Sequence, residues 1–333
     1  ATRAMDQDGT DHTALGGELR RNPVSDKLTI VAPARAARPR DAGRAPATPG
    51  PAGEPGSPTG PGADAEACPF CAGNEALTPP EIEALRPAGG APDTPGWTLR
   101  VVPNKYPALP GMHEVIVHSP DHRVELEDLS PDELTAVVAC YQRRIDAQLA
   151  AGAAAATLDV NRGPGSGASL AHPHAQLFAT PVVPSLLQDE LMAFARHRNR
   201  YGTCVVCDEL EQAAERLVFA GDIAAWTPAA PRFACELWLA PVAHAADVRD
   251  ADPAALGTAL RRALVAVTTA TAGAPFNLWF HSAPADLRGT YHWHVEVAPR
   301  LNEIAGFELA TAVAVVSVDP VAGAAALRAA APA

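Results

Sequence analysis

The sequence lacks any apolar run approaching the roughly 18 residues that a membrane-spanning helix needs. Its first nine residues contain no apolar stretch of the kind that forms the centre of a secretory signal. Basic residues are also fewer than acidic ones, and the net charge is −12. This charge argues against a general binding surface for nucleic acid or anionic membranes. From these absences we expect a cytoplasmic protein that binds neither nucleic acid nor membrane.

Cysteine is scarce as well, with six residues in a chain of 333. Four of the six form two Cys-x-x-Cys pairs, which suits metal sites in a reduced compartment better than a disulfide scaffold. Cys140 and Cys235 have no such partner, and we expect both to be small buried side chains. The length and the 47% hydrophobic content fit two domains, or one duplicated fold with a large core.

Large apolar side chains are almost absent from residues 41–66, which consist mostly of Pro, Gly and Ala. Such a segment cannot bury enough surface to offset its ordering entropy, so we expect a flexible insertion. The preceding residues 1–40 form an N-terminal arm, with a short strand predicted at 27–31.

The rest of the chain contains one pattern twice. A Cys-x-x-Cys pair is followed by an isolated histidine and then by a His-x-His motif, at His172/His174 and again at His292/His294. Gln176 in the first copy is matched by Glu296 in the second. We therefore predict two tandem repeats, a catalytic one at 67–200 and a structural, metal-binding one at 201–320, followed by a C-terminal tail at 321–333.

Each repeat is predicted to contain strands and one long helix. The first helix begins at Ser130, which forms a capping box with Glu133, and ends before Gly152. Helices are also expected near 253–271 and, connecting the repeats, near 185–198. Strands are expected at 114–118, around Leu158, and at 236–239 and 277–280, which favours an α+β fold with a mostly antiparallel sheet.

Both Cys-x-x-Cys pairs have the composition of zinc sites. Two thiolates on one tight turn can reach one tetrahedral ion, and two histidines complete the Cys₂His₂ set that zinc prefers. The predicted sets are Cys68, Cys71, His122 and His172, and Cys204, Cys207, His244 and His292. A redox pair is the alternative for either motif, but it would predict a single pair at a helix start. A carboxylate–histidine set of Glu190, His281, His292 and His294 competes for His292, so we expect one of the two second-repeat sets to be filled.

His174 is the predicted nucleophile. Residues two apart on a strand face the same side, so His172 can bind metal while His174 faces a ligand. An imidazole whose Nδ1–H is held by a backbone carbonyl presents its Nε2 lone pair, which can attack phosphorus. Gln176 and the glycine-rich loop at 163–169 are placed to donate hydrogen bonds to a phosphoryl group. The alternative, a second metal-binding role for His174, does not account for Gln176 or the loop.

Taken together, these motifs resemble the galactose-1-phosphate uridylyltransferases, a branch of the histidine-triad superfamily. The resemblance covers nearly the whole chain and rests on residues 35–39, 68–71, 103–107, 119–122 and 172–176. It implies a duplicated histidine-triad fold, zinc, a homodimer, and a role in galactose metabolism. It also implies a ping-pong exchange between a UDP-glucose-like nucleotide sugar and a galactose 1-phosphate-like acceptor, through a nucleotidyl group on His174.

The resemblance also assigns roles to further residues. Gln176, Asn161 and Ser169 match positions that handle the phosphates, and Asn104 matches a base or ribose contact. Arg35 and Arg38 match an arm that reaches the partner subunit. Ala175 stands where the family usually has glycine, and Phe307 lies where some members have a tyrosine that holds the second substrate. Phosphorolysis of an ADP-sugar and hydrolysis of a nucleotide sugar therefore stay open, as does a zinc-stapled module that binds nucleotide without reacting.

Overall fold

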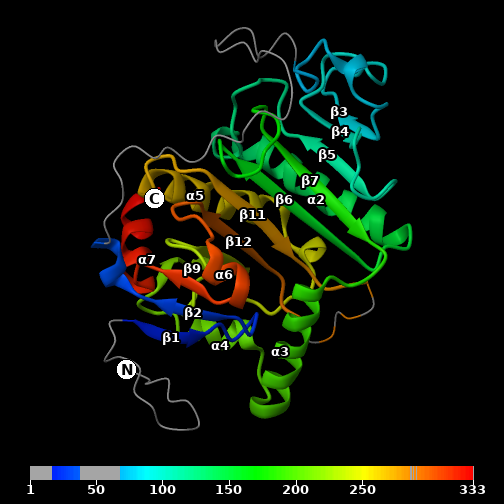
Figure 1. Ribbon diagram of the computed structural model, residues 1–333. Helices are drawn as coiled ribbons and strands as arrows, with labels where there is room; N and C mark the ends of the chain where they lie inside the picture. Colours follow the sequence, from blue (N-terminus) through cyan, green and yellow to red (C-terminus); the bar gives the residue numbers. More distant parts are fainter. Residues whose placement is uncertain (1–16, 38–67, 286, 288, 290, 333) are drawn as a thin grey trace.

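The computed structural model describes residues 17–37 and 68–332, apart from 286, 288 and 290 (Figure 1). The predicted insertion at 41–66 and Arg38 lie outside these residues. A ten-stranded sheet runs in the order β3-β4-β5-β7-β6-β11-β12-β10-β9-β8, and its paired strands are antiparallel. This confirms the predicted α+β class with a mostly antiparallel sheet.

The strands of the sheet divide into two equal halves. The first half contains β3 (Glu83–Leu85), β4 (Leu99–Pro103), β5 (His113–Val117), β6 (Ala155–Arg162) and β7 (His174–Thr180). The second half contains β8 (Leu217–Phe219), β9 (Ile223–Trp226), β10 (Leu237–Pro241), β11 (Phe276–His281) and β12 (His294–Pro299). Counted inward from its edge, each half has its first three strands in chain order, then its fifth strand and then its fourth. The sheet therefore has the symmetry of a duplication.

The two halves join where β6 pairs with β11 at the centre of the sheet. Asp159 lies directly opposite Trp279 in this pairing. The two residues have the same sequence separation as His174 and His294, so each occupies the same place in its own half. A pseudo-two-fold axis therefore passes between Asp159 and Trp279. We keep the division into repeats at residue 200 as a proposal based on this symmetry.

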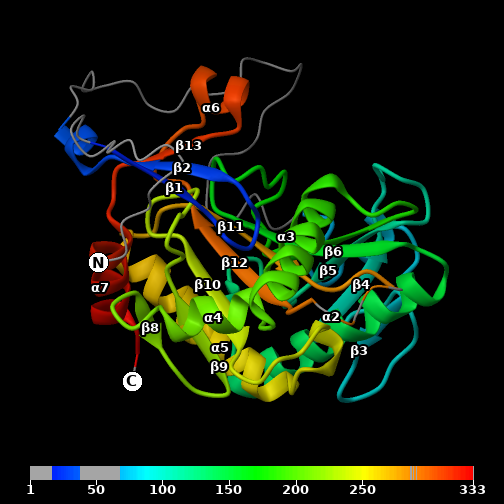
Figure 2. The same cartoon turned by 90° about the horizontal axis from the view of Figure 1, so that it is seen from below.

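Helices α2 (Pro131–Ala150) and α5 (Pro253–Ala270) pack together on one face of the sheet (Figure 2). Helix α2 begins as predicted: Ser130 Oγ accepts from Glu133 N, and the Glu133 carboxylate accepts from Ser130 N. Gly152, just past its end, has a φ of +99°, which favours glycine. Helix α5 is capped by Asp252, which accepts two backbone N–H groups. The core lies between these helices and the sheet.

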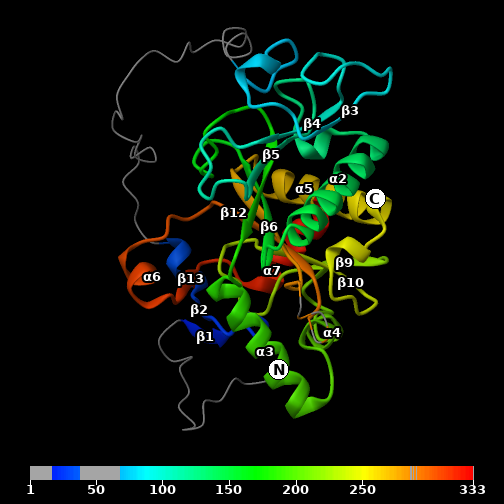
Figure 3. The same ribbon diagram turned by 90° about the vertical axis from the view of Figure 1, so that its right-hand side faces the viewer.

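The other face of the sheet is covered mainly over its second half. A three-stranded sheet of β1 (Glu18–Arg21), β2 (Leu28–Val31) and β13 (Ala314–Val316) lies there, on the side opposite α2 and α5 (Figure 3). Helices α3 (Ser185–Tyr201) and α4 (Val205–Glu211) contribute buried side chains to the second apolar cluster on this face. A short helix, α6 (Gly306–Thr311), precedes β13 and has no buried residue.

The last residues form a helix, α7 (Pro320–Ala330), which packs on α5 and β8 and buries Ala324 and Leu327. Residues 320–330 are therefore part of the core, although the sequence suggested a tail. Cys140 is fully buried as expected, whereas Cys235 is half-buried with a φ of +59°. No helix among the described residues is both long and apolar enough to cross a membrane.

Candidate active site and metal centres

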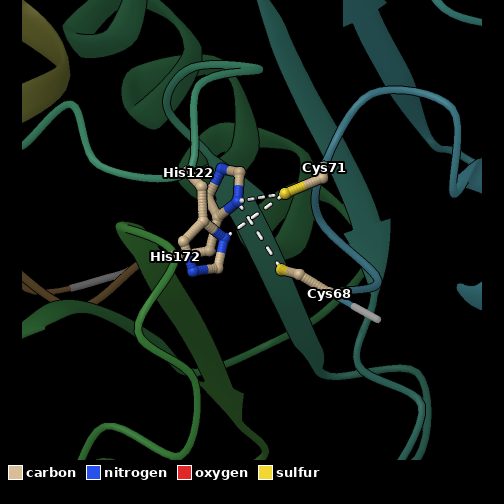
Figure 4. Close-up of side chains that lie close together, drawn as sticks. All are labelled: Cys68, Cys71, His122 and His172. Carbon is tan, nitrogen blue, oxygen red and sulfur yellow. Dashed lines mark hydrogen bonds between the residues drawn. The ribbon is translucent and has the colours of Figure 1, made fainter. Parts of the chain in front are cut away.

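The four side chains of the first predicted Cys₂His₂ set come together (Figure 4). Its cysteines pack with Val115 and Val117, on the face of the sheet opposite α2. Cys71 Sγ lies 3.3 Å from His122 Nδ1 and 3.6 Å from His172 Nδ1, and Cys68 Sγ lies 3.7 Å from His172 Nδ1. Ordinary Zn–S and Zn–N bonds at a tetrahedral angle place sulfur and nitrogen about 3.6 Å apart. The four side chains therefore fit one tetrahedral zinc ion.

Neighbouring groups hold these ligands in place. His172 Nε2 donates to the carbonyl of Ser119 at 2.8 Å, which leaves Nδ1 for an ion. The turn itself is fixed by Asn74, whose Nδ2 donates to Cys68 O at 2.9 Å. Burial and the adjacent Cys68 raise the pKa of Cys71 to about 12. Without a cation the Cys71 side chain is thus a thiol, and a bound ion would displace its proton.

The second predicted set repeats this arrangement. His292 Nδ1 lies 3.5 Å from the sulfurs of both Cys204 and Cys207, and Cys207 Sγ lies 3.9 Å from His244 Nδ1. His292 Nε2 donates to the carbonyl of Pro241 at 3.0 Å, the counterpart of the bond from His172 to Ser119. This set also fits zinc, although its position is more open, because His244 is exposed.

A third group forms in the second half of the sheet, and it differs from the predicted carboxylate–histidine set. It contains Glu190, His281, His294 and Glu296, whereas His292 belongs to the cysteine set. The expectation that the two sets share His292 and exclude each other was therefore wrong. Glu296, the counterpart of Gln176, takes the place of His292, so both groups can be filled at once.

The third group is buried and highly charged. His281 Nδ1 lies 3.1 Å from Glu190, and His281 Nε2 lies 3.3 Å from Glu296, which also pairs with Arg232. Three of its buried atoms have no hydrogen-bond partner among the described residues: Glu190 Oε1, His294 Nε2 and Glu296 Oε1. Carboxylate and imidazole donors suit zinc, iron or manganese, so these atoms fit a divalent cation.

His174 is the first residue of β7 and lies outside all three groups. Its Nδ1 donates to the carbonyl of His172 at 2.8 Å, which leaves the lone pair on Nε2. Burial lowers the pKa of His174, so the neutral form prevails at neutral pH. His172 precedes the strand, so a loop carbonyl, and not a shared strand face, sets the relation between the two histidines.

Gln176 lies two residues along β7, on the same face as His174. Ala108 N donates to His113 Nδ1 at 3.2 Å, so the ring proton lies on Nε2 and is donated to Gln176 Oε1 at 2.9 Å. This bond turns the Gln176 amide so that its NH₂ group can serve a ligand. Asn104 Nδ2 lies 3.0 Å from the same His113 nitrogen, which brings the predicted base or ribose contact next to Gln176.

The two other residues predicted to contact the phosphates, Asn161 and Ser169, lie in different surroundings. Asn161 lies on β6, where its Oδ1 accepts from Asn277 at 2.5 Å. Ser169 is exposed in the loop before β7, and Gly163, Gly165 and Gly167 have positive φ values there. Such a backbone path favours glycine, as the sequence indicated.

Arg35 lies elsewhere, in the short helix Pro33–Ala37, where it is exposed. Figure 1 shows this blue segment well away from β7. Within one chain, Arg35 is therefore not part of the site.

Known proteins resemble this chain in sequence and in fold. The sequence pattern described as "Galactose-1-phosphate uridyl transferase, N-terminal domain" matches residues 105–184. An ADP-glucose phosphorylase of Arabidopsis thaliana is 28% identical over 93% of both chains, and a galactose-1-phosphate uridylyltransferase of Thermotoga maritima is 25% identical over 85% of this chain and 86% of its own. The crystal structure of an Arabidopsis ADP-glucose phosphorylase with bound ADP-glucose superposes with a TM-score of 0.80, at 27% identity over 94% of this chain and 98% of that one.

The chain thus resembles the galactose-1-phosphate uridylyltransferase family over most of its length.

The sequence did not single out four residues that lie beside the candidate site: His113, Asp159, Asn277 and Trp279. Each lies on the same sheet face as His174, at alternate positions of β5, β6 and β11. Alternation was the available signal, since Asp159 and Asn161 are two apart, as are Asn277 and Trp279. The pairing of β6 with β11 that brings them together was not predictable from local pattern.

Proposed function

We propose that this protein transfers the nucleoside monophosphate of a nucleotide sugar to an acceptor by a ping-pong mechanism, with His174 as the nucleophile. The observation that carries the proposal is the state of this one ring. Its proton is held on Nδ1 by the His172 carbonyl, and its Nε2 belongs to none of the three candidate metal groups in the described part of the chain.

In the first half-reaction, His174 Nε2 attacks the α-phosphorus and a P–N bond forms. The bond from that phosphorus to the bridging oxygen breaks, and the sugar 1-phosphate leaves with the electron pair. The imidazole gains positive charge, which the His172 carbonyl stabilises through the Nδ1–H bond. The Gln176 NH₂ group and backbone N–H groups of the loop at 163–169 are the proposed donors to the phosphoryl oxygens.

In the second half-reaction, an oxygen of the acceptor attacks the same phosphorus and the P–N bond breaks. His174 leaves as a neutral imidazole with its proton still on Nδ1, so the enzyme returns to its starting state. No separate general base is needed when the acceptor is a phosphate oxygen that is already ionised.

For the acceptor, we propose inorganic phosphate, with an ADP-sugar as the donor. The likeness to the Arabidopsis ADP-glucose phosphorylase, over nearly the full length of both chains, supports this choice. Phe307 supports it as well, because a half-exposed phenyl ring on α6 cannot donate a hydrogen bond to a second sugar. The sequence favoured uridylyl transfer and left phosphorolysis of an ADP-sugar as the alternative. We propose the opposite order of preference.

The second candidate is transfer of uridylate from a UDP-glucose-like donor to a hexose 1-phosphate. The match of residues 105–184 to the uridyl transferase pattern and the likeness to the Thermotoga enzyme favour it. Phosphorus NMR with either ADP-glucose plus phosphate or UDP-glucose plus galactose 1-phosphate separates the two. We expect ADP and glucose 1-phosphate from the first mixture; conversion of the second mixture alone would reverse the assignment.

We further propose that both Cys₂His₂ sets hold zinc. In the first set zinc would be held by Cys68, Cys71, His122 and His172, and its contribution there is structural. His172 would then be fixed at two points, through its Nδ1 and its Nε2. The carbonyl of the same residue orients His174, so this anchor would pre-position the nucleophile.

The remaining proposals concern the assembly and the cell. We propose a cytoplasmic homodimer in which Arg35 and Arg38 of one subunit reach the phosphate site of the other. Arg35 is exposed, and its segment lies away from β7 of its own chain (Figure 1), which supports a role across a subunit boundary. Mixing an Arg35→Ala, Arg38→Ala variant with a His174→Asn variant should restore part of the activity if subunits exchange. Absence of restoration in verified mixed dimers would contradict the arm's role.

A further inference from the structure

Five side chains form one line across the face of the sheet that carries His174. Asn104 contacts His113, His113 bonds to Gln176, and Gln176 lies opposite Asp159, which lies opposite Trp279. The proposed chemistry takes place beside Gln176. The predicted nucleoside contact, Asn104, lies on the β5 side of it, so the rest of a nucleotide sugar extends toward β6 and β11.

Asp159 has no role in the proposed reaction. It is half-buried, and its Oδ2 accepts a hydrogen bond from Asn161 Nδ2 at 3.0 Å. Burial raises the pKa of Asp159 to about 7. A carboxyl group kept in this position at an energetic cost is suited to bind hydroxyl groups, since a carboxylate accepts strong hydrogen bonds and its protonated form also donates one.

Trp279 is held rigidly beside Asp159. Its Nε1 donates to His281 Nε2 at 2.5 Å, the guanidinium of Arg232 lies 5.3 Å from the ring centre, and Phe233 meets the ring nearly edge-on. The next residue in the line, Glu296, is buried and paired with Arg232. Trp279 is therefore the last side chain of the line that is partly exposed.

We propose that Asp159 and Trp279 form the subsite for the sugar of the nucleotide sugar, a hexose with free hydroxyl groups. This inference rests on the proposed function. Neighbouring strands lie about 4.8 Å apart, so Trp279 is about 10 Å from Gln176, which is the interval that a β-phosphate and a pyranose ring span. Sugar hydroxyls bond to the carboxyl group of Asp159, and the apolar face of the ring packs on the indole, which is large and rigid.

Binding titrations in a His174→Asn background, where no turnover occurs, test the subsite. Two ligand pairs are compared, ADP-glucose with ADP and UDP-glucose with UDP, so that only the sugar differs within a pair. Asp159→Leu is expected to weaken binding of the nucleotide sugar about tenfold or more, the usual loss for a charge-assisted hydrogen bond. Trp279→Leu is expected to weaken it several-fold, because the sugar ring loses the indole on which it packs. Binding of the nucleoside diphosphate should be nearly unchanged.

The matched control is Asp146→Leu, which removes a carboxylate on α2, behind the sheet. It should leave all four ligands unaffected. Circular dichroism verifies folding, and Asp159→Asn, which keeps the shape of the side chain, replaces Asp159→Leu if that variant does not fold.

Two results would overturn the subsite. In the first, Asp159→Leu and Trp279→Leu weaken the binding of nucleotide sugars and nucleoside diphosphates equally, or leave the binding of both unchanged. The sugar then does not lie over these residues, although the proposed function stands. If neither nucleotide pair binds to the His174→Asn protein, the proposed function itself fails and the subsite fails with it.

Discussion

His174 and His294 donate the same hydrogen bond in the two halves of the sheet, from Nδ1 to the carbonyl of the histidine two residues earlier, at 2.8 and 3.2 Å. The duplication has kept this geometry while changing what surrounds it. His174 has Gln176 beside it, whereas His294 lies in a buried group with Glu296 and His281. Acidic side chains would repel a phosphoryl group, and we therefore place the chemistry in the first half only.

The amide of Gln176 is expected to act on the transition state. Gln176→Ala should lower the rate of nucleotidyl transfer to His174 about 10²- to 10³-fold, as for the loss of one oxyanion donor. Gln176→Glu, which recreates the arrangement of the second half, should lower it further, because a carboxylate repels the phosphoryl oxygens. Single-turnover kinetics measure the step. A rise in KM with an unchanged single-turnover rate would show that Gln176 serves binding alone.

The metal groups of the second half should empty independently. The wild-type protein is expected to contain two zinc ions and a third divalent cation, counted by elemental analysis. Cys204→Ser with Cys207→Ser should remove one zinc and leave the third cation, while Glu190→Gln should do the reverse, because the groups share no ligand. Loss of both ions in either variant would contradict two separate sites.

Removal of the first zinc should disturb both stability and chemistry. The ligands come from three distant segments, so the ion would bind the folded chain alone and contribute to its stability. Cys71→Ser is expected to lower the melting temperature markedly and to abolish labelling of His174, because His172 loses an anchor. His174→Asn serves as the control and should melt like the wild type. An unchanged melting curve in a Cys71→Ser protein with verified zinc loss would exclude a structural role.

Stability should also depend on the ionisation of Asp159. Its pKa is about 7 in the folded chain, against an ordinary value of 3.8, so folding favours the protonated form. This contribution to stability is fully present below about pH 4 and is lost as the pH rises through 7. Asp159→Asn is uncharged at any pH and should therefore melt at a higher temperature than the wild type at pH 8, with a smaller difference at pH 5. An equal difference at both values would mean that the carboxyl group titrates normally.

Local signals were sufficient for much of this fold. Ser130 with Glu133 marked the start of α2, and the two Cys-x-x-Cys pairs with their histidines marked both cysteine sets. These features succeed because a cap or a ligand turn is decided by residues close in sequence. The prediction of a C-terminal tail was wrong, although the same kind of local signal is present there. Asp319 caps α7 by accepting from Val321 N and Ala322 N, and Pro320 follows it.

Long-range geometry accounts for what the sequence left open. The choice between two ligand sets for His292 depends on which atoms its Nδ1 faces. It faces the sulfurs of Cys204 and Cys207, at the start of α4, from the segment that precedes β12. Arg232, which pairs with Glu296, lies in a loop with no distinguishing motif. The line from Asn104 to Trp279 depends on the register of β6 against β11, a pairing of residues more than one hundred positions apart that the local sequence pattern does not predict.

Mass spectrometry of the intact protein, after mixing with ADP-glucose or UDP-glucose and no acceptor, tests the central claim most directly. We predict a gain of one nucleoside monophosphate, mapped by peptide analysis to His174, absent from His174→Asn and lost when phosphate or a sugar 1-phosphate is added. Turnover with no such adduct, or an adduct that persists in His174→Asn, would contradict the account.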